Sequence, residues 1–132
     1  MTEPETCEIV QVREDGVLVL RRGGADRLAR LHGVNVPYPP PSLYFEILSR
    51  LAAAGRALHC QVVAEEALAS VRLSYLAWQD KSGDVWKDVA AMLLAQGVVT
   101  TAPGAFPGRE EYEREEESAR RQAIGIWGKR PS

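Results

Sequence analysis

Alternating apolar and polar residues near the start of the chain predict three strands of a β-meander. Residues 7–12 and 16–20 are mostly β-branched or aliphatic, and the polar residues between them are typical of a hairpin turn. Gly23 and Gly24 can both take positive φ, and after them the side chains of residues 28–33 fall alternately on two faces. We therefore expect three consecutive strands in this part of the chain.

A change to helical spacing follows a stretch that is almost all proline, residues 37–41. Proline lacks an amide donor and favours an extended polyproline conformation, and Ser42 after it is a suitable N-cap. Leu43, Ile47 and Leu51 then recur at helical spacing, and Gly55 is placed to end the helix. We expect this helix to pack its apolar face on the sheet.

The second half of the chain is predicted to contain two more strands, followed by two helices. Two stretches rich in β-branched and aliphatic residues predict strands, residues 58–64 and 71–78. After a turn at residues 80–83, Asp84 can cap a helix whose apolar residues recur on one side from Val85 to Leu93. Gly97 is placed to end that helix, and a segment rich in proline and glycine follows.

The last predicted helix, residues 109–123, is the most highly charged part of the chain. Opposite charges four residues apart are expected to form ion pairs on its surface: Glu110 with Arg114, Glu116 with Arg120, and Glu117 with Arg121. We expect a solvated helix with few core contacts. Gly125 is placed to end it, and Ile126 and Trp127 are expected to fold back as an apolar clamp.

The predicted order β-β-β-α-β-β-α-α indicates a fold of the α+β class that is mainly β. A small five-stranded barrel of the oligonucleotide/oligosaccharide-binding (OB) type, with three helices packed outside, suits this order. With 132 residues the chain is long enough for one such domain, which we expect over residues 7–128. Residues 1–6 are then a flexible N-terminus, and residues 129–132 form a basic C-terminal tail.

Composition restricts the classes of function that are possible, but it does not identify one. The formal net charge of −2 supplies no overall attraction for phosphate, so nucleic-acid binding would need a local basic patch. A hydrophobic content of 45% is typical of a soluble domain, and no membrane association is expected. The first residues show no secretory signal, which predicts a cytoplasmic protein. Neighbouring strands could bring Cys7 and Cys60 together, but in that compartment free thiols are the expectation.

One strand that ends in a proline turn points to a family: Arg30-Leu31-His32-Gly33-Val34-Asn35-Val36-Pro37-Tyr38. It resembles the Arg-Leu-x-Gly-Ile/Val-Asp-x-Pro-Glu segment of the staphylococcal nuclease (thermonuclease) family. Three further pieces resemble that family in the same order: Leu73-Ser74-Tyr75-Leu76 followed by Gly83-Asp84-Val85, Leu93-Leu94-Ala95-Gln96-Gly97-Val98, and Tyr112 through Ala119-Arg120 to Gly125-Ile126-Trp127. The resemblance spans about residues 7–127 and implies the OB barrel of that family.

The residues that match the family's catalytic positions have lost its chemistry. The resemblance implies two aspartates that bind calcium, a glutamate that acts on water, and two arginines that neutralise charge on phosphate. Val17 and Asn35 match the two aspartates, and Tyr38 matches the glutamate. Arg30 and Val71 match the two arginines. Valine cannot bind a cation, asparagine brings no charge, and tyrosine is a poor base at neutral pH. We therefore expect no bound calcium, no other metal or cofactor, and no nuclease activity.

Two arginines remain as candidate anion contacts. Arg30 keeps its position in the motif, although a surface arginine whose stem packs on its neighbours explains it equally well. Arg72 lies one residue after the second arginine position, and a one-residue offset turns a strand side chain to the opposite face unless the strand begins irregularly. The histidines and tryptophans have simpler explanations: we expect His32 and His59 to be ordinary strand residues, and Trp86 and Trp127 to be core residues. A relocated metal site could be built from Glu14, Asp15 and Asp80, but only if the fold brings them together in a favourable geometry.

Several functions compete. The leading hypothesis is a catalytically inactive staphylococcal-nuclease-like domain that serves as a binding or interaction module. One alternative is binding of single-stranded DNA or RNA by a basic stripe with a stacking aromatic, made of Arg21, Arg22, Arg27, Arg30, Arg72 and Tyr38. Another is a residual calcium-dependent phosphodiesterase with a rearranged site. Docking of a protein, or self-association, rests on the stiff ridge of Pro39, Pro40 and Pro41, which is equally well explained as a short rigid connector.

Overall fold

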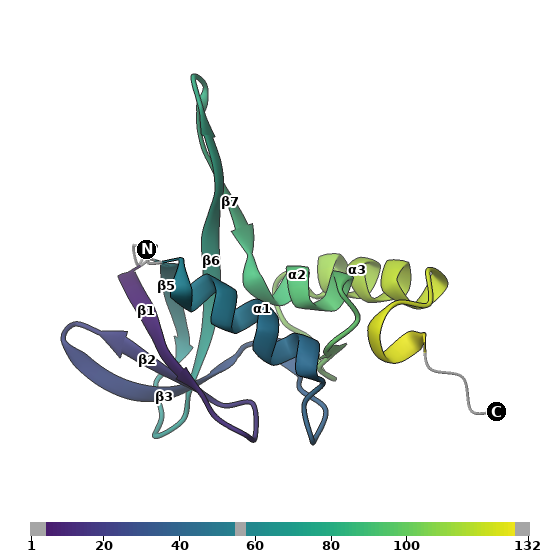
Figure 1. The fold of residues 1–132 in the computed structure, drawn as a ribbon, viewed down its shortest axis with the longest axis horizontal. Coiled ribbons are helices and arrows are strands. Elements are labelled where there is room, and N and C mark those ends of the chain that lie inside the picture. The colour runs from purple at the N-terminus through teal and green to yellow at the C-terminus, as the bar shows by residue number, and fades with distance from the viewer. Residues whose placement is uncertain (1–4, 55–57, 129–132) are drawn as a thin grey trace.

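Five strands close into a small barrel in the computed structural model, which describes residues 5–54 and 58–128 (Figure 1). Neighbouring strands pair in the order β3-β2-β1-β5-β6, and a parallel pairing of β3 with β6 completes the circle. The strands are β1 (Glu5–Val12), β2 (Leu18–Arg22), β3 (Ala25–Leu31), β5 (Leu58–Ala64) and β6 (Ala69–Asp80). The predicted mainly β fold of the α+β class, with a closed barrel of OB-like form and three helices, is confirmed.

The inward-facing side chains of alternate strand residues fill the barrel. Leu18 and Leu20 of β2 and Val71 and Leu73 of β6 are fully buried, two residues apart on each strand. Each such side chain contributes about 1.5–3 kcal/mol by leaving water. Strand β2 begins later than the predicted residue 16, because the turn before it extends to Val17, whose carbonyl accepts from the Arg13 amide at 2.8 Å.

Strand β1 begins earlier than the hydrophobic pattern predicts. Glu5 and Thr6 belong to the segment predicted as a flexible N-terminus, but they pair with Cys60 and His59 of β5. Both side chains are exposed, so backbone pairing rather than burial holds them in the sheet. The predicted basic tail and the predicted helix terminator Gly55 lie outside the described residues.

Helix α1 (Ser42–Ala53) covers one side of the barrel, where Tyr44 and Leu48 enter the core. The Tyr44 hydroxyl donates to the Gly16 carbonyl at 2.5 Å and so ties the helix to the turn between β1 and β2. Ser42 was predicted as the N-cap, but Pro41 occupies that position and no side chain caps the first turn. Pro41, with φ −60° and ψ 148°, supplies the extended backbone from which the helix starts.

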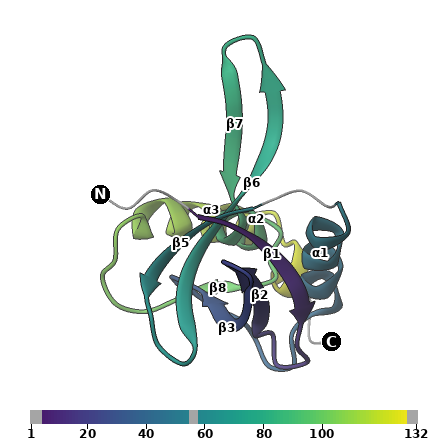
Figure 2. The same cartoon turned by 90° about the vertical axis from the view of Figure 1, so that its left-hand side faces the viewer.

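The largest correction concerns the residues after the predicted turn at 80–83, where Asp84 was predicted to cap a helix that starts at Val85. The chain there forms strand β7 (Gly83–Asp88), which pairs with the second half of β6 in a long hairpin that leaves the barrel (Figures 1 and 2). The helical spacing of Val85 was misleading, because pairing with β6 decides the conformation of this segment. Helix α2 (Val89–Ala95) is correspondingly short, and its true N-cap is Asp88, whose Oδ1 accepts from the Ala91 amide at 3.1 Å.

A second, two-stranded sheet joins the end of the barrel to the second half of the chain: β4 (Val34–Asn35) pairs with β8 (Thr100–Thr101). Strands of two residues leave no periodic pattern, so the sequence did not predict them. Gly33 before β4 has φ +85°, and a Cβ there would lie 2.9 Å from ring atoms of both Phe106 and Tyr112. Glycine therefore allows the chain to turn directly against these rings.

Helix α3 (Arg109–Arg121) is highly charged, as predicted, but it is attached to the core more firmly than predicted. Tyr112 and Ala119 are buried, and the Tyr112 hydroxyl donates to Asp88 Oδ2 at 2.8 Å. Burial, with the Asp88 charge, raises the pKa of Tyr112 well above its usual range. Two predicted ion pairs form, Glu116 with Arg120 and Glu117 with Arg121, whereas the described residues pair Arg109 with Glu113 in place of Glu110 with Arg114.

The chain folds back after α3, although not at the predicted residue. The helix ends at Arg121, and Gly125 begins a short 3-10 helix, η1 (Gly125–Trp127). The Ile126 amide donates to the Gly97 carbonyl at 2.8 Å, and the Arg120 guanidinium lies 4.5 Å from the centroid of the Trp127 ring.

Two tryptophans predicted as core residues lie outside the core. Trp127 is half-buried under Arg120, and Trp86 of β7 is half-buried against His59, with ring centroids 3.5 Å apart. Both residues belong to segments that lie outside the barrel. Among the described residues, no helix has the length and apolar character needed to cross a membrane.

Candidate functional site

A groove with a volume of about 300 Å³ lies beside the end of β3, on the outer face of the barrel. We call it the Arg30 groove. One wall is formed by the end of β3 and by β4, and the other by the loop that follows β8. The side chains that line it and carry polar atoms are Arg30, His32, Asn35 and Ser70. The loop adds mainly small and apolar residues, with Phe106 as its one ring.

The parallel pairing of β3 with β6 builds this groove. Arg30 lies opposite Ser70 in that pairing, so both side chains are on the same, outward face of the sheet. Arg72 follows Ser70 by two residues and therefore shares this face, whereas Val71 is fully buried in the barrel. The one-residue offset noted in the sequence thus places Arg72 on the face that carries Arg30.

Arg72 also secures the loop that forms the far wall of the groove. Its guanidinium donates to the carbonyl of Pro107, and it lies next to Gly108 at the start of α3. Gly108 has φ +87°, a conformation that suits glycine, and its Cβ position would lie 3.5 Å from the guanidinium nitrogens. Arg72 therefore holds the loop in place and adds positive charge near the groove.

His32 is the most perturbed side chain of the groove. Its Nδ1 lies 3.1 Å from Ser70 Oγ, and its ring meets the Phe106 ring edge-on with centroids 5.4 Å apart. Burial lowers the pKa of His32 below its usual 6.5, and the positive charges of Arg72 and Arg30 lower it further. The charges of Arg72 and Arg30 thus act on His32 and indicate a positive local potential in a protein of net negative charge.

The donor set of this groove suits an anion. A guanidinium, an imidazole, an amide and a hydroxyl can all donate hydrogen bonds, and none of the residues that line the groove is a carboxylate. Calcium, in contrast, takes six to eight oxygen ligands, several of them charged. Asn35 and Ser70 are the only side chains lining the groove that carry oxygen, and both are neutral. Within the described part of the chain, no three His, Cys, Asp or Glu residues are grouped to hold a metal ion.

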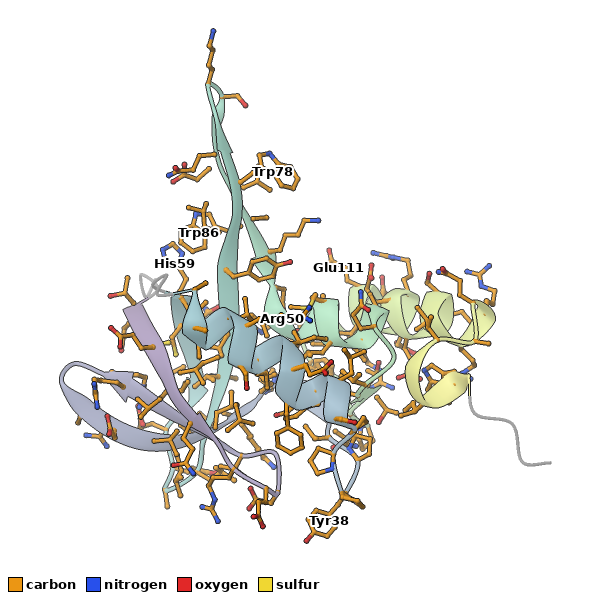
Figure 3. All side chains as sticks on the ribbon, in the orientation of Figure 1. Tyr38, Arg50, His59, Trp78, Trp86 and Glu111 are labelled. Atoms are coloured by element: carbon orange, nitrogen blue, oxygen red, sulfur yellow. The ribbon has the colours of Figure 1, made fainter. Side chains whose placement is uncertain are left out.

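Of the four degenerate catalytic positions, only Asn35 lines the Arg30 groove. Val17 is half-buried in the turn after β1, where its amide donates to Asp15 Oδ1 at 3.0 Å, and Val71 is a core residue. Tyr38 is 81% exposed and borders a separate hollow (Figure 3). That hollow also contains Glu14 and Asp15, whereas the side chain of Asp80 is not described.

The predicted basic stripe is not a continuous surface. Arg22 is buried and forms a 2.9 Å ion pair with Glu65, because strand alternation turns it to the inside of the sheet. Arg21 is exposed but paired with Asp26 at 2.9 Å. Arg27 lies opposite Leu20, an inward-facing residue, so it and Arg30 lie on different faces of β3. The stripe is therefore divided between the two faces of the sheet.

The proline segment presents less surface than a ridge would. Pro39 is exposed and Pro41 half-buried, but Pro40 is buried against the turn that contains Gly16. The Tyr38–Pro39 peptide bond is cis. Tyr38 and Pro39 are thus the exposed part of this segment.

The two cysteines face each other inside the barrel. Cys7 and Cys60 are on neighbouring strands β1 and β5, and both are free and buried. A hydrogen bond between the two thiols, together with burial, raises the pKa of Cys7 above its usual range. Neither thiol lines the Arg30 groove.

Three of the residues that form this site were not predicted from the sequence, namely His32, Ser70 and Phe106. A signal for His32 was present, because it follows Arg30 by two residues and a strand would place both on one face. Ser70 and Phe106 reach the groove only through the pairing of β3 with β6 and the course of the loop after β8. No local pattern predicts either contact.

No protein-family model matches the chain, and no curated protein matches it significantly.

Proposed function

We propose that this protein is a non-catalytic binding module of staphylococcal-nuclease type that holds the phosphate groups of a single-stranded nucleic acid in the Arg30 groove. The observation that carries the proposal is the donor set of the groove, with Arg30 and His32 exposed to a ligand and no carboxylate among its lining residues. Charged donors of this kind bind phosphate oxygens strongly, and Arg72 adds attraction from the same face.

A second hollow extends this surface along β6. It has a volume of about 210 Å³ and is reached from Ser70 by way of Arg72 and Ser74, on the same outward face of the strand. Trp86 stacked on His59 forms its aromatic wall, and Gln61 adds hydrogen-bonding groups. Its one carboxylate, Asp88, is already an acceptor for the Ala91 amide and the Tyr112 hydroxyl. Cations followed by an aromatic surface and amide groups suit a strand with phosphates and unpaired bases.

The residues at the positions that match the family's catalytic residues argue against cleavage of the bound strand. The positions that would carry calcium and activate water are Val17, Asn35 and Tyr38, which bring no carboxylate. Val17 and Tyr38 moreover lie outside the groove. Without a charged metal ligand or a general base, a phosphodiester in the groove would be bound and left intact.

Fluorescence anisotropy with fluorescein-labelled oligo-dT and oligo-U tests the proposal. We expect binding that weakens between about 50 mM and 200 mM salt, because counterions are released from the phosphates. Arg30→Ala should weaken binding about 10-fold or more, since a hydrogen bond to a charged group is worth about 1.5–3 kcal/mol. Arg27→Ala is the matched control, because it removes the same charge from the other face of the same strand.

Two outcomes would contradict the proposal. The absence of a salt-sensitive anisotropy change, or an equal loss for the two arginine variants, would exclude nucleic-acid binding in this groove. Inorganic phosphate and a mononucleotide, added as competitors, distinguish a strand-binding surface from a site for a small anion. Incubation of the oligonucleotides with millimolar calcium should yield no shorter products, and cleavage that is lost in Arg30→Ala would show an enzyme.

A further inference from the structure

The β6–β7 hairpin extends well beyond the barrel (Figure 2), and its Trp78 side chain is half exposed to solvent. From Tyr75 to Asp80, β6 pairs with β7 alone, and β7 is the last strand of the sheet. A two-stranded hairpin is marginally stable by itself in water. A projecting hairpin with half-exposed rings is therefore a candidate contact surface.

The two faces of the hairpin differ in what covers them. On one face Trp86 stacks on His59 of the barrel. Trp78 points to the other side, above α2 and α3 (Figure 3), and it is 50% exposed. Its only ring contact among the described residues is with Lys87 Nζ, 5.3 Å from the ring centroid. This second face is the one left open.

A hollow of about 350 Å³ lies where this open face meets helix α2. We call it the hairpin cleft. Tyr75 and Lys87 of the hairpin form one wall, and Ala91, Met92 and Ala95 of α2 form the floor. All three floor residues are half-buried, so apolar atoms remain accessible. Methionine is flexible and polarisable, which suits a floor that must adapt to a bound side chain.

The far rim of the cleft is acidic and unneutralised. Glu111 and Glu115 lie one turn apart on α3 and both line the cleft. The ion pairs of α3 among the described residues involve Glu113, Glu116 and Glu117, and neither Glu111 nor Glu115 takes part in one. Together with Asp88 these carboxylates outnumber Lys87, the one cation that lines the cleft. The cleft therefore attracts a cation attached to an apolar side chain or stem, and it repels phosphate.

We propose that the hairpin cleft docks a basic amphipathic segment of a partner protein. Apolar side chains of that segment would rest on Met92 and Tyr75 and against Trp78, and its lysines or arginines would meet Glu111 and Glu115. Aromatic and methionine contacts at the centre with charges at the rim are the usual composition of a protein-binding surface. The cleft shares no lining residue with the Arg30 groove, although Asp88 lines both the cleft and the second hollow along β6.

The probe is a fluorescein-labelled amphipathic peptide of leucine and lysine at helical spacing, compared with the same peptide carrying glutamate in place of lysine. We expect the lysine peptide to bind with a Kd of about 100 µM or tighter, and the glutamate peptide to show no binding. Trp78→Ala should weaken binding about 10-fold or more, because its exposed ring adjoins the cleft through its contact with Lys87 of the cleft wall. Val63→Ala, which truncates an equally exposed apolar residue of β5, should leave it unchanged.

A double substitution tests the acidic rim. Glu111→Gln with Glu115→Gln should weaken the lysine peptide about 3-fold to 10-fold, since exposed ion pairs contribute little each. Glu14→Gln with Glu46→Gln is the control, because it removes the same charge from exposed residues elsewhere. Unchanged thermal midpoints would show that all these variants are folded.

Three results would overturn the inference: no binding of the lysine peptide, equal binding of both peptides, or binding that Trp78→Ala leaves unchanged. An oligo-dT whose affinity falls in Trp78→Ala would instead assign the hairpin to nucleic acid. Arg30→Ala should leave peptide binding unchanged, so failure of the peptide test and failure of the oligonucleotide test are distinguishable.

Discussion

The two halves of strand β6 are both rich in apolar residues but have different surroundings. Up to Ser74 the strand closes the barrel, and Val71 and Leu73 are fully buried. From Tyr75 onward it pairs with β7 alone, and Trp78 is 50% exposed. Apolar content alone therefore does not distinguish a core strand from an exposed ribbon, because burial depends on what packs against each face.

This difference separates stability from surface chemistry along one strand. The barrel half is packed on the inside and carries Ser70 and Arg72 of the proposed anion surface on the outside. The hairpin half is held by cross-strand pairs, which contribute about 0.2–1 kcal/mol each. Substitutions in the barrel half should therefore affect folding, whereas those in the hairpin should chiefly affect binding.

The largest expected effect comes from truncating a core residue of the barrel half. Leu73→Ala should lower the free energy of unfolding by about 2–5 kcal/mol, because it removes a fully buried side chain and leaves a cavity. Leu76→Ala, three residues later in the hairpin, should cost clearly less, since Leu76 is only half-buried. Urea denaturation followed by circular dichroism measures both, and equal losses would contradict the comparison.

A glycine pair gives a second, smaller contrast. Gly97 has φ +70°, and a Cβ there would collide with the carbonyl of Ile124, whereas the Cβ position at Gly83 in the hairpin turn meets nothing within 4 Å. Gly97→Ala should cost about 2–4 kcal/mol through overpacking and backbone strain, and Gly83→Ala about 1–2 kcal/mol through strain alone. The thermal midpoints of the two variants test this contrast. A larger loss of stability in Gly83→Ala than in Gly97→Ala would show that the hairpin turn is the more constrained.

The smallest expected effect is a dependence of the free energy of unfolding on pH, which arises from His32. His32 has a folded pKa below its usual 6.5, so below pH 6.5 the unfolded chain binds a proton that the folded chain does not. The contribution of His32 to stability should therefore be fully present above pH 6.5 and decline as the pH falls towards the folded pKa. Urea midpoints across this range measure the slope, and His32→Gln should remove it.

NMR titration of the His32 ring adds a link to the proposed ligand. A bound phosphate next to the imidazole favours its protonated form, so oligo-dT should raise the pKa of His32. An unchanged pKa in the presence of saturating oligo-dT would place the ligand elsewhere on the protein.

The sequence predicted most elements whose pattern is local. The spacing of Leu43, Ile47 and Leu51 predicted α1, and the alternation on each side of the Gly23–Gly24 turn predicted β2 and β3. It failed at Val85, where helical and strand spacing both fit and only pairing with β6 decided the outcome. The resemblance to staphylococcal nuclease stays a hypothesis, carried by the motif that runs from Arg30 to Tyr38.

The candidate site was predictable only in part. The sequence alone determined which side chains are available: a retained arginine, a second arginine near it, and no carboxylate at the matching catalytic positions. Tertiary structure decided that Arg30, His32 and Ser70 meet in one groove, that Arg22 is buried against Glu65, and that Trp78 is left exposed. The physical reason is that local spacing sets the face of each side chain, whereas contacts between residues distant in sequence form only when the barrel closes.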